Sequence, residues 1–248
     1  MSPTLRIGIF GRGRLGAAIA DVVGETEGAE LAWTVGRNES PQEGADVVID
    51  ASSASAVEAH LQWCLDHGAD FLIGTTGWTL PDLEARTGQR IGVITAPNFS
   101  LTVALYARLS LILARFAAGD EAKDPYLVEH HHARKHDAPS GTAKLLAGVL
   151  MKGCPRKTEW AIPAAGGDLK AHQLNVSSIR AGHTYSSHIV GIDAPGEVLE
   201  LHHAARSPRP YAEGALVAAR WIRGRKGLFT MDQVAKDVLD PLFEGAQP

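Results

Sequence analysis

The first half of this chain alternates short apolar runs with amphipathic helical patterns, and this alternation constrains the fold more than any other feature. Runs such as LRIGIF, ADVVID and RIGVITA are rich in β-branched residues and show no in–out alternation. Apolar strands of this kind, separated by helices, are typical of a parallel sheet covered on both faces. We therefore predict an α/β fold for this half, with a Rossmann-type doubly wound parallel sheet.

The pattern changes after Pro97. A long helix is expected at about residues 101–118, followed by the strand-like PYLVEHHH and by a helix after the Pro-Ser-Gly turn. The segments LNVSSIRAG, HTYSSHIVGI and GEVLELHHAA then alternate in polarity and are joined by turn signals. They predict an inserted α+β domain, residues 103–207, with a mixed or antiparallel sheet. The tail is expected to be helical and to rejoin the first domain, which comprises residues 1–102 and 208–248.

The overall charge and the cysteine content exclude several partners. The formal net charge is −4, which gives no field that would recruit nucleic acid or an anionic membrane. The two cysteines lack the spacing of a zinc or redox motif, which favours a reducing compartment. The longest apolar stretch, LTVALYARLSLILARFAA, is interrupted by Arg108 and Arg115 and indicates a packed helix. We expect a cytoplasmic protein that binds neither nucleic acid nor a membrane.

A glycine-rich loop follows the first predicted strand. Gly11, Gly13 and Gly16 form a G-x-G-x-x-G pattern between that strand and the first predicted helix. Glycines in this context let the backbone approach a pyrophosphate, which then lies against the amino terminus of the helix. The loop therefore predicts dinucleotide binding. The alternative is a glycine-rich turn that only allows the helix to pack on the strand.

The end of the second predicted strand bears on the choice of dinucleotide. A carboxylate is usual there, about 20 residues after the loop, where it holds the ribose 2′-hydroxyl of NAD. This sequence has Gly36 and Arg37 at that place, so no carboxylate is expected and a guanidinium stands next to it. Arg37, with Arg12 as a second positive charge, predicts NADPH as the cofactor. Alternatively, Arg37 is only a solvated loop charge.

The stretch EHHHARKHDAPSGTA, residues 129–143, concentrates ionisable and hydroxyl side chains that are common in active sites. Consecutive histidines on a strand point to opposite faces, and Arg134 and Lys135 would repel a dication, so we expect no metal. The Pro-Ser-Gly-Thr turn before a helix instead offers free amides and two hydroxyls to an anion. A carboxylate seat beside an imidazole, combined with a nicotinamide, indicates reduction of a carboxylated C=C or C=N bond. A solvated charged loop is the alternative.

The same stretch resembles the signature E-x-H-H-x-x-K-x-D-A-P-S-G-T-A of the dihydrodipicolinate reductase family. GRLG, GTTG at 74–77, APNFS at 96–100 and ELHHAARSPRPYAEGA extend the resemblance along nearly the whole chain. It implies a nucleotide domain with an inserted substrate and tetramerisation domain. The implied activity is NAD(P)H-dependent reduction of 4-hydroxy-tetrahydrodipicolinate in the diaminopimelate and lysine pathway, and members often accept both NADPH and NADH.

The resemblance also assigns roles to residues. His131 and Lys135 fall on the catalytic positions that deliver a proton while the nicotinamide delivers hydride. The substrate-binding positions are His132, Ser140, Gly141 and Thr142. The cofactor-binding positions, joined with those from the loop, are Gly11, Arg12, Gly13, Arg14, Leu15, Gly16, Arg37, Gly74, Thr75, Thr76, Ala96, Asn98 and Phe99.

Departures from the family pattern leave two alternatives open. The glycine loop is one residue shorter than usual, Ala51 stands where an aromatic residue is usual, and Pro208 splits the expected Ser-Arg pair. One alternative is a sibling reductase of another carboxylated imine or enamine. The other is a nonenzymatic nucleotide-sensing protein on the same scaffold, although such a protein would need neither His131 nor Lys135.

The assembly state follows from the segments between Leu174 and His203. No second helical layer to cover their sheet is evident in the sequence, and an open sheet face is commonly closed by a symmetry-related copy. We therefore expect an oligomer, a homotetramer by the resemblance. The alternative is that helices cover one face and the other is simply polar.

Overall fold

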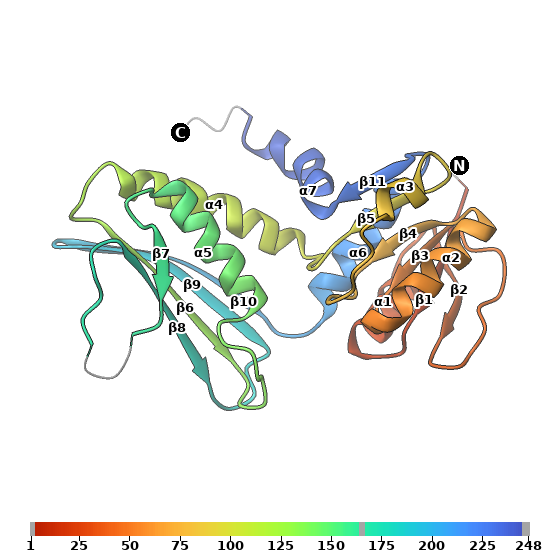
Figure 1. Ribbon diagram of the computed structural model, residues 1–248, viewed down its shortest axis with the longest axis horizontal. Helices are drawn as coiled ribbons and strands as arrows, with labels where there is room; N and C mark the ends of the chain where they lie inside the picture. Colours follow the sequence, from red (N-terminus) through yellow and green to blue (C-terminus); the bar gives the residue numbers. More distant parts are fainter. Residues whose placement is uncertain (1–2, 164–166, 245–248) are drawn as a thin grey trace. The chain divides into compact units, whose positions relative to one another are not determined.

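The computed structural model describes residues 3–163 and 167–244. The chain divides into two compact units, Met1–Leu101 with Pro208–Pro248, and Thr102–Ser207 (Figure 1). The first unit is therefore assembled from both ends of the sequence, and the second unit is a continuous segment between them.

The first unit contains a parallel sheet of six strands in the order β11-β5-β4-β3-β1-β2. The strands are β1 (Leu5–Phe10), β2 (Ala29–Val35), β3 (Val47–Asp50), β4 (Asp70–Ile73), β5 (Gly92–Thr95) and β11 (Gly227–Thr230). The predicted Rossmann-type parallel sheet is confirmed.

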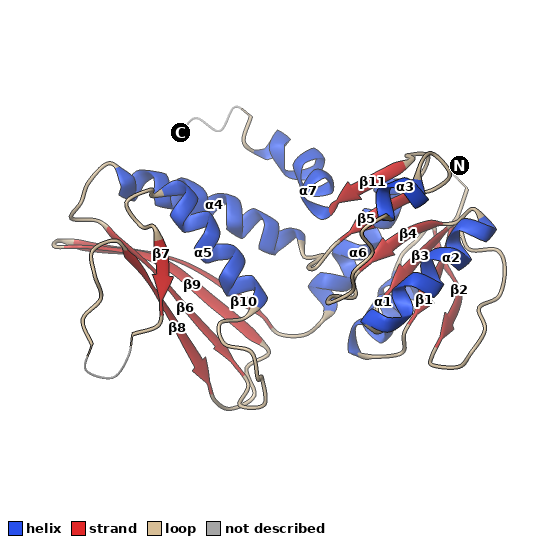
Figure 2. Cartoon of the chain, in the orientation of Figure 1, coloured by secondary structure: helices blue, strands red, loops and turns tan. Residues whose placement is uncertain are grey.

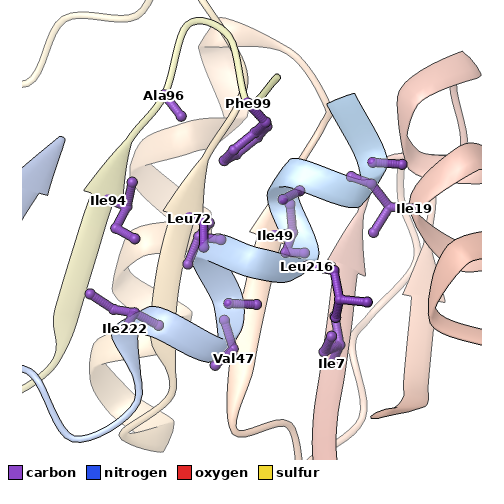
Figure 3. Close-up of a cluster of buried hydrophobic side chains, with 14 of the residues drawn as sticks. Ile7, Ile19, Val47, Ile49, Leu72, Ile94, Ala96, Phe99, Leu216 and Ile222 are labelled. Carbon is purple, nitrogen blue, oxygen red and sulfur yellow. The ribbon is translucent and has the colours of Figure 1, made fainter. Parts of the chain in front are cut away.

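Helices cover both faces of this sheet, as the uninterrupted apolar strands predict. Side chains from α1 (Arg14–Glu25), α6 (Arg209–Ile222) and α7 (Met231–Leu239) pack with one face of the strands, and those from α2 (Val57–His67) and α3 (Leu83–Thr87) pack with the other. Two short 3-10 turns, η1 (Ala54–Ala56) and η2 (Asp240–Leu242), complete the unit. Figure 3 shows part of the buried cluster on the face covered by α1, α6 and α7. Leu216 and Ile222 of α6 lie there against strand residues such as Leu72.

The expectation of a wholly helical tail is wrong at residues 227–230. Gly224 and Gly227 have positive φ values of 76° and 110°, so the chain leaves the helical conformation between α6 and α7. The GLFT segment that follows adds β11 to the sheet, parallel to β5. The segment is too short to show a strand period, and pairing with β5 decides its conformation.

The second unit contains a mixed sheet of five strands in the order β10-β9-β6-β8-β7. Its elements are α4 (Leu101–Ala118), β6 (Asp124–His131), α5 (Gly141–Gly153), β7 (Glu159–Ala161), β8 (Gln173–Arg180), β9 (Ser186–Ala194) and β10 (Glu197–Ala205) (Figure 2). Strand β6 is parallel to β8 and antiparallel to β9. The predicted α+β character and mixed sheet are confirmed, while β7 was not expected.

One face of this sheet packs against α4 and α5. Leu127, Val176 and Val190 from the three central strands join apolar residues of both helices in one buried cluster. Helix α4 is long and apolar enough to cross a membrane by length and composition, as core helices often are. Its Leu113 and Ala114 belong to the buried cluster, so this face of α4 forms part of the core of the second unit.

Candidate active site

The glycine loop of the first unit has the backbone geometry that dinucleotide binding requires. Gly11 has φ 111°, and a Cβ atom there would lie 2.3 Å from the carbonyl oxygen of Ala51. A Cβ atom on Gly16 would lie 2.0 Å from the carbonyl oxygen of Gly11. Only glycine therefore fits at either position. Gly13 is the N-cap of α1 and makes no side-chain capping bond, so the first amides of α1 remain available to a phosphate.

A cavity of about 500 Å³ opens beside this loop. Residues from the loop, from the turn after β2 and from the segment after β3 line it, including Gly11, Arg12, Arg37 and Ser52. This position, at the carboxyl ends of the strands, is where doubly wound sheets bind nucleotides. The free amides at the start of α1 and the two arginines in the lining are groups that can bind a nucleotide phosphate.

The structure corrects the expectation that no carboxylate lies near the ribose position. Glu39, three residues beyond Gly36, also lines the cavity. Its Oε2 accepts a hydrogen bond from the backbone amide of Gly36 at 2.8 Å and lies 2.8 Å from Nη2 of Arg12. The sequence did not reveal Glu39 because this residue lies beyond the end of β2. A turn folds its side chain back to the end of the strand.

A second cavity of about 270 Å³ brings together Leu15, Gly74, Thr75 and Thr76. Behind it, the fully buried Asp50 accepts hydrogen bonds from Thr75 Oγ1 and from Ser52 Oγ, the latter at 2.9 Å. His60 contacts the same carboxylate through Nδ1 and stacks on Phe10 with ring centroids 3.6 Å apart. A buried carboxylate thus fixes the loops after β3 and β4 beside the glycine loop.

Five of the predicted cofactor residues line neither cavity, and one of them is Gly16, which packs against the backbone of Gly11. Ala96 and Phe99 are each 1% exposed and belong to the hydrophobic core. The Oδ1 atom of Asn98 accepts a hydrogen bond from the amide of Ser100 at 2.8 Å, which stabilises the turn. Arg14 is exposed at the start of α1. The side chain of Phe99 limits the space at Gly74, where a Cβ atom would lie 2.5 Å from the ring.

The catalytic candidates of the second unit lie at one end of its sheet, where the helix-facing side of the strands becomes polar. Leu127, Glu129 and His131 alternate along β6 on that side, and all three are buried. The strand register places Glu129 opposite Ser178 of β8 and opposite His188 of β9. His131 lies opposite Arg180 in the same ladder.

Glu129 is the centre of this polar end. Its Oε1 accepts hydrogen bonds from Arg180 Nη2 at 2.7 Å, from Ser178 Oγ at 2.7 Å and from the amide of Ser140 at 3.0 Å. Its Oε2 lies 3.4 Å from His131 Nδ1 and 3.6 Å from His188 Nε2. No hydrogen bond reaches Oε2 within the described residues, so this oxygen can accept from either ring.

Burial and local charge shift the two titrating groups. Burial lowers the pKa of His131 to about 4; Glu129 opposes this shift, and the positive charges of Lys135 and Arg180 add to it. Burial alone would raise the pKa of Glu129, but the polar and positively charged groups around its carboxylate outweigh burial and hold the pKa well below its usual range. The groups that do so are His188, Ser140, Ser178 and Arg180. At neutral pH the site therefore contains a carboxylate and a neutral imidazole at position 131.

The predicted anion seat is a helix amino terminus. Ser140 is the N-cap of α5, its Oγ accepts from the amide of Ala143 at 3.1 Å, and Gly141 and Thr142 begin the helix. His132 follows directly after β6 and is half-buried. Lys135 Nζ lies 2.7 Å from Asp137 Oδ1 in the turn between β6 and α5, and this contact lowers the pKa of Asp137. The turn thus brings one ammonium group and free helix amides to the same end of the sheet.

The side-chain ligand atoms of Glu129, His131 and His188 lie within 4.8 Å of one another, the spacing that a metal ion would need. Arg180 already pairs with the carboxylate at 2.7 Å. A dication would add positive charge beside that guanidinium, which is costly for buried groups. Arg180 therefore balances the charge of the carboxylate without a metal, and the expectation of no metal stays a prediction.

Sequence reasoning did not assign Glu129, Arg180 or His188. A signal existed for Glu129, since it stands two residues before His131 on a predicted strand and so shares its face. Arg180 and His188 come from other strands and meet Glu129 only through the sheet register. A single sequence gives no register for strands joined by long connections.

A doubly wound nucleotide unit, combined with a unit that offers a buried imidazole beside a helix amino terminus, defines a two-domain pyridine-nucleotide oxidoreductase. Comparison with known proteins makes the class specific. The family model for the amino-terminal part of dihydrodipicolinate reductase matches residues 5–99, and the model for its carboxy-terminal part matches residues 102–235. The chain belongs to the dihydrodipicolinate reductase family.

Individual relatives agree. A 4-hydroxy-tetrahydrodipicolinate reductase of Laribacter hongkongensis is 33% identical over 93% of this chain and 97% of its own length. That of Myxococcus xanthus is 38% identical over 77% of this chain and 72% of its own length. A dipicolinate-bound dihydrodipicolinate reductase from Paenisporosarcina sp. TG-14 has the same fold, with a TM-score of 0.74 at 23% identity, covering 92% of this chain and 97% of that one.

The resemblance inferred from EHHHARKHDAPSGTA is therefore confirmed. The chain is an oxidoreductase of the diaminopimelate and lysine pathway, and its reaction is the pyridine-nucleotide-dependent reduction of 4-hydroxy-tetrahydrodipicolinate.

Proposed function

We propose that this chain reduces its cyclic dicarboxylate substrate with NADPH in preference to NADH, and that His131 and Lys135 supply the proton. The observation that carries the proposal is the polar sheet end, where a buried imidazole, an ammonium group and a helix amino terminus lie together. The Paenisporosarcina relative binds dipicolinate, a planar dicarboxylate of the same class.

Reduction adds one hydride and one proton to the substrate. The nicotinamide supplies the hydride when it is bound, and the chain must supply the proton. His131 is neutral in the free protein because its pKa is about 4, and the side chain of Lys135 lies at the same end of the sheet as a second candidate donor. A bound dicarboxylate adds negative charge, which favours the imidazolium form. We infer that His131 gains its proton when substrate binds and loses it in the reaction.

The carboxylate seat is formed by the first turn of α5. The amides of Gly141 and Thr142 are not used in the helix, and the hydroxyl of Thr142 adds a further donor. Ser140 is committed to the cap and to Glu129, so its part is to fix the turn rather than to donate freely. His132, half-buried after β6, completes the proposed substrate contacts.

Arg37 supports the preference for NADPH. It is exposed, lines the adenosine cavity and makes no hydrogen bond or ion pair that can be seen with the described residues. A guanidinium binds a phosphate through two parallel charge-assisted hydrogen bonds, each worth about 1.5 to 3 kcal/mol before solvent screening.

We also propose a homotetramer in the cytoplasm. The sheet face of the second unit that points away from α4 and α5 exposes Ile179 and Val198, which are 46% and 56% exposed. Apolar side chains on an uncovered sheet face are commonly closed by a second copy. The net charge and the isolated cysteines suit a reducing compartment.

The test of the proposed function is NADPH oxidation with substrate made fresh by the preceding synthase. Turnover well above the rate without substrate is expected, and light scattering on the same sample should give the mass of a tetramer. No turnover with either nucleotide would refute the proposed function. A monomer at micromolar concentration would refute the assembly alone.

A further inference from the structure

The turn after β2 places a carboxylate at a position where the sequence pattern has none. Residues Gly36 to Glu39 form a tight turn in which the amide of Glu39 donates to the carbonyl of Gly36 at 3.3 Å. Asn38, at φ 65°, is the one described non-glycine residue with positive φ, and this conformation reverses the chain. The side chain of Glu39 then returns to the amide of Gly36.

This return brings the carboxylate to the strand end itself. A Cβ atom built on Gly36 would lie 3.8 Å from both Cδ and Oε2 of Glu39. The carboxylate of Glu39 thus lies beside the site that an acidic side chain at position 36 would reach. These are ordinary van der Waals distances, so a side chain at position 36 would lie in direct contact with the carboxylate of Glu39.

The carboxylate is also paired with the glycine loop. Arg12 Nη2 contacts Oε2 of Glu39 at 2.8 Å and donates to the carbonyl of Thr34 at 3.0 Å. Arg12 is therefore a compensated charge, and Arg37 is the uncompensated one among the three charged residues that line this cavity.

We infer that Glu39 is the ribose-specificity residue of this chain, and that it binds the 2′-hydroxyl of NADH and opposes the 2′-phosphate of NADPH. The inference rests on the proposed function, because it assumes that the adenosine end of a pyridine nucleotide occupies the cavity. A carboxylate accepts from a ribose hydroxyl, whereas a phosphate beside it is repelled and must displace it from Arg12. Arg37 and Glu39 act in opposite directions, and the site accepts both nucleotides.

The decisive variant is Glu39→Gln, which keeps the size of the side chain and an oxygen that can accept from Gly36. Dissociation constants for NADH and NADPH are measured from nucleotide fluorescence without substrate. We expect NADPH to bind about 3 to 10 times more tightly than to the wild type and NADH to bind more weakly by a similar factor, the range being modest because Glu39 is 42% exposed. Glu43→Gln is the matched control, since Glu43 is exposed, follows the same turn and does not line the cavity.

The outcomes separate this inference from the proposed function. Equal changes for both nucleotides in Glu39→Gln would indicate that Glu39 only stabilises the turn and would overturn the inference. Unchanged constants, or the same change in Glu43→Gln, would also overturn it while leaving the reductase activity in place. A wild-type protein that binds neither nucleotide would overturn the proposed function itself, and the inference with it.

Discussion

The two units hold their charged groups in opposite ways. In the first unit, Arg12 and Glu39 lie on loops and are 58% and 42% exposed. In the second unit, Glu129 and His188 lie on strands and are 0% and 1% exposed. The first unit thus carries its charges where water screens them, whereas the second unit carries charges that are shielded from water.

This difference sets the size of every expected effect. Exposed ion pairs contribute about 0 to 1 kcal/mol because water and salt screen them. Removing one partner of a buried pair costs about 3 to 5 kcal/mol, since the other charge is left without compensation. Substitutions in the second unit should therefore change rate and stability strongly, and those in the first unit should mainly adjust which nucleotide binds.

The largest effect is expected for the proton donors of the second unit. His131→Gln and Lys135→Ala should each lower kcat by about 100 to 10,000-fold with smaller changes in KM, because a positioned proton donor acts in the transition state. Steady-state assays of both variants check this. His136→Gln is the control, as His136 is exposed in the same turn. A variant of His131 or Lys135 with wild-type kcat would remove that residue from the chemistry.

The next largest effect is on stability, and it differs between a buried and an exposed carboxylate. Glu129→Gln should lower the free energy of unfolding of the second unit by about 3 kcal/mol, because Arg180 loses its buried partner. Glu30→Gln in the first unit breaks the ion pair between Glu30 and Arg6. Both side chains are about half exposed, so the free energy of unfolding should fall by less than about 1 kcal/mol. Calorimetry should show a fall in Tm of roughly 10 °C for the first variant only. Equal falls would break the comparison between the units.

The pH dependence of stability should also come from the second unit. The pKa of His131 is about 4 in the folded protein against an ordinary value of 6.5, so between these values the unfolded chain binds a proton that the folded chain does not. Stability therefore rises with pH through this window and falls on acidification, by up to about 3 kcal/mol. The lowered pKa of Glu129 acts in the same direction at lower pH. His131→Gln should reduce the difference in Tm between pH 7 and pH 5. If the difference is unchanged, groups other than His131 cause the pH dependence of stability.

A smaller effect is expected at Arg37. Arg37→Ala should lower the ratio of kcat/KM for NADPH to that for NADH by roughly 10-fold, at the lower end of the range for a charged hydrogen bond because the side chain is exposed. Arg223→Ala, which removes the same charge from the end of α6, should leave the ratio unchanged. A ratio that stays unchanged in Arg37→Ala would return Arg37 to a solvated loop charge.

The sequence predicted most of the scaffold because the scaffold depends on local patterns. The apolar runs of β1 and β3 and the helix at 101–118 are short-range signals, and the structure has them where they were expected. The GLFT strand was missed because only pairing with β5 reveals it. The motif EHHHARKHDAPSGTA identified the family and its chemistry without the structure.

What the sequence could not supply are contacts between segments that are far apart in the chain. Glu129 meets Arg180 across 51 positions and His188 across 59, through a register that no single segment encodes. Glu39 escaped notice for the opposite reason: it is close in sequence to the expected place, but a residue with positive φ returns it to the strand end. In both cases a charged side chain acquires its partner from tertiary geometry rather than from its neighbours.

The smallest effect is expected from metal removal, which tests whether Arg180 alone balances the charge of the buried carboxylate. The ligand atoms of Glu129, His131 and His188 are close enough for an ion, but Arg180 already compensates the carboxylate. Dialysis against a strong chelator should leave kcat and Tm unchanged, with the Glu129→Gln variant treated in parallel as a sample whose cluster is already disturbed. If activity is lost and zinc restores it, the neutral His131 inferred here becomes a metal ligand. In that case a metal ion, and not Arg180 alone, would balance the charge of the buried carboxylate of Glu129.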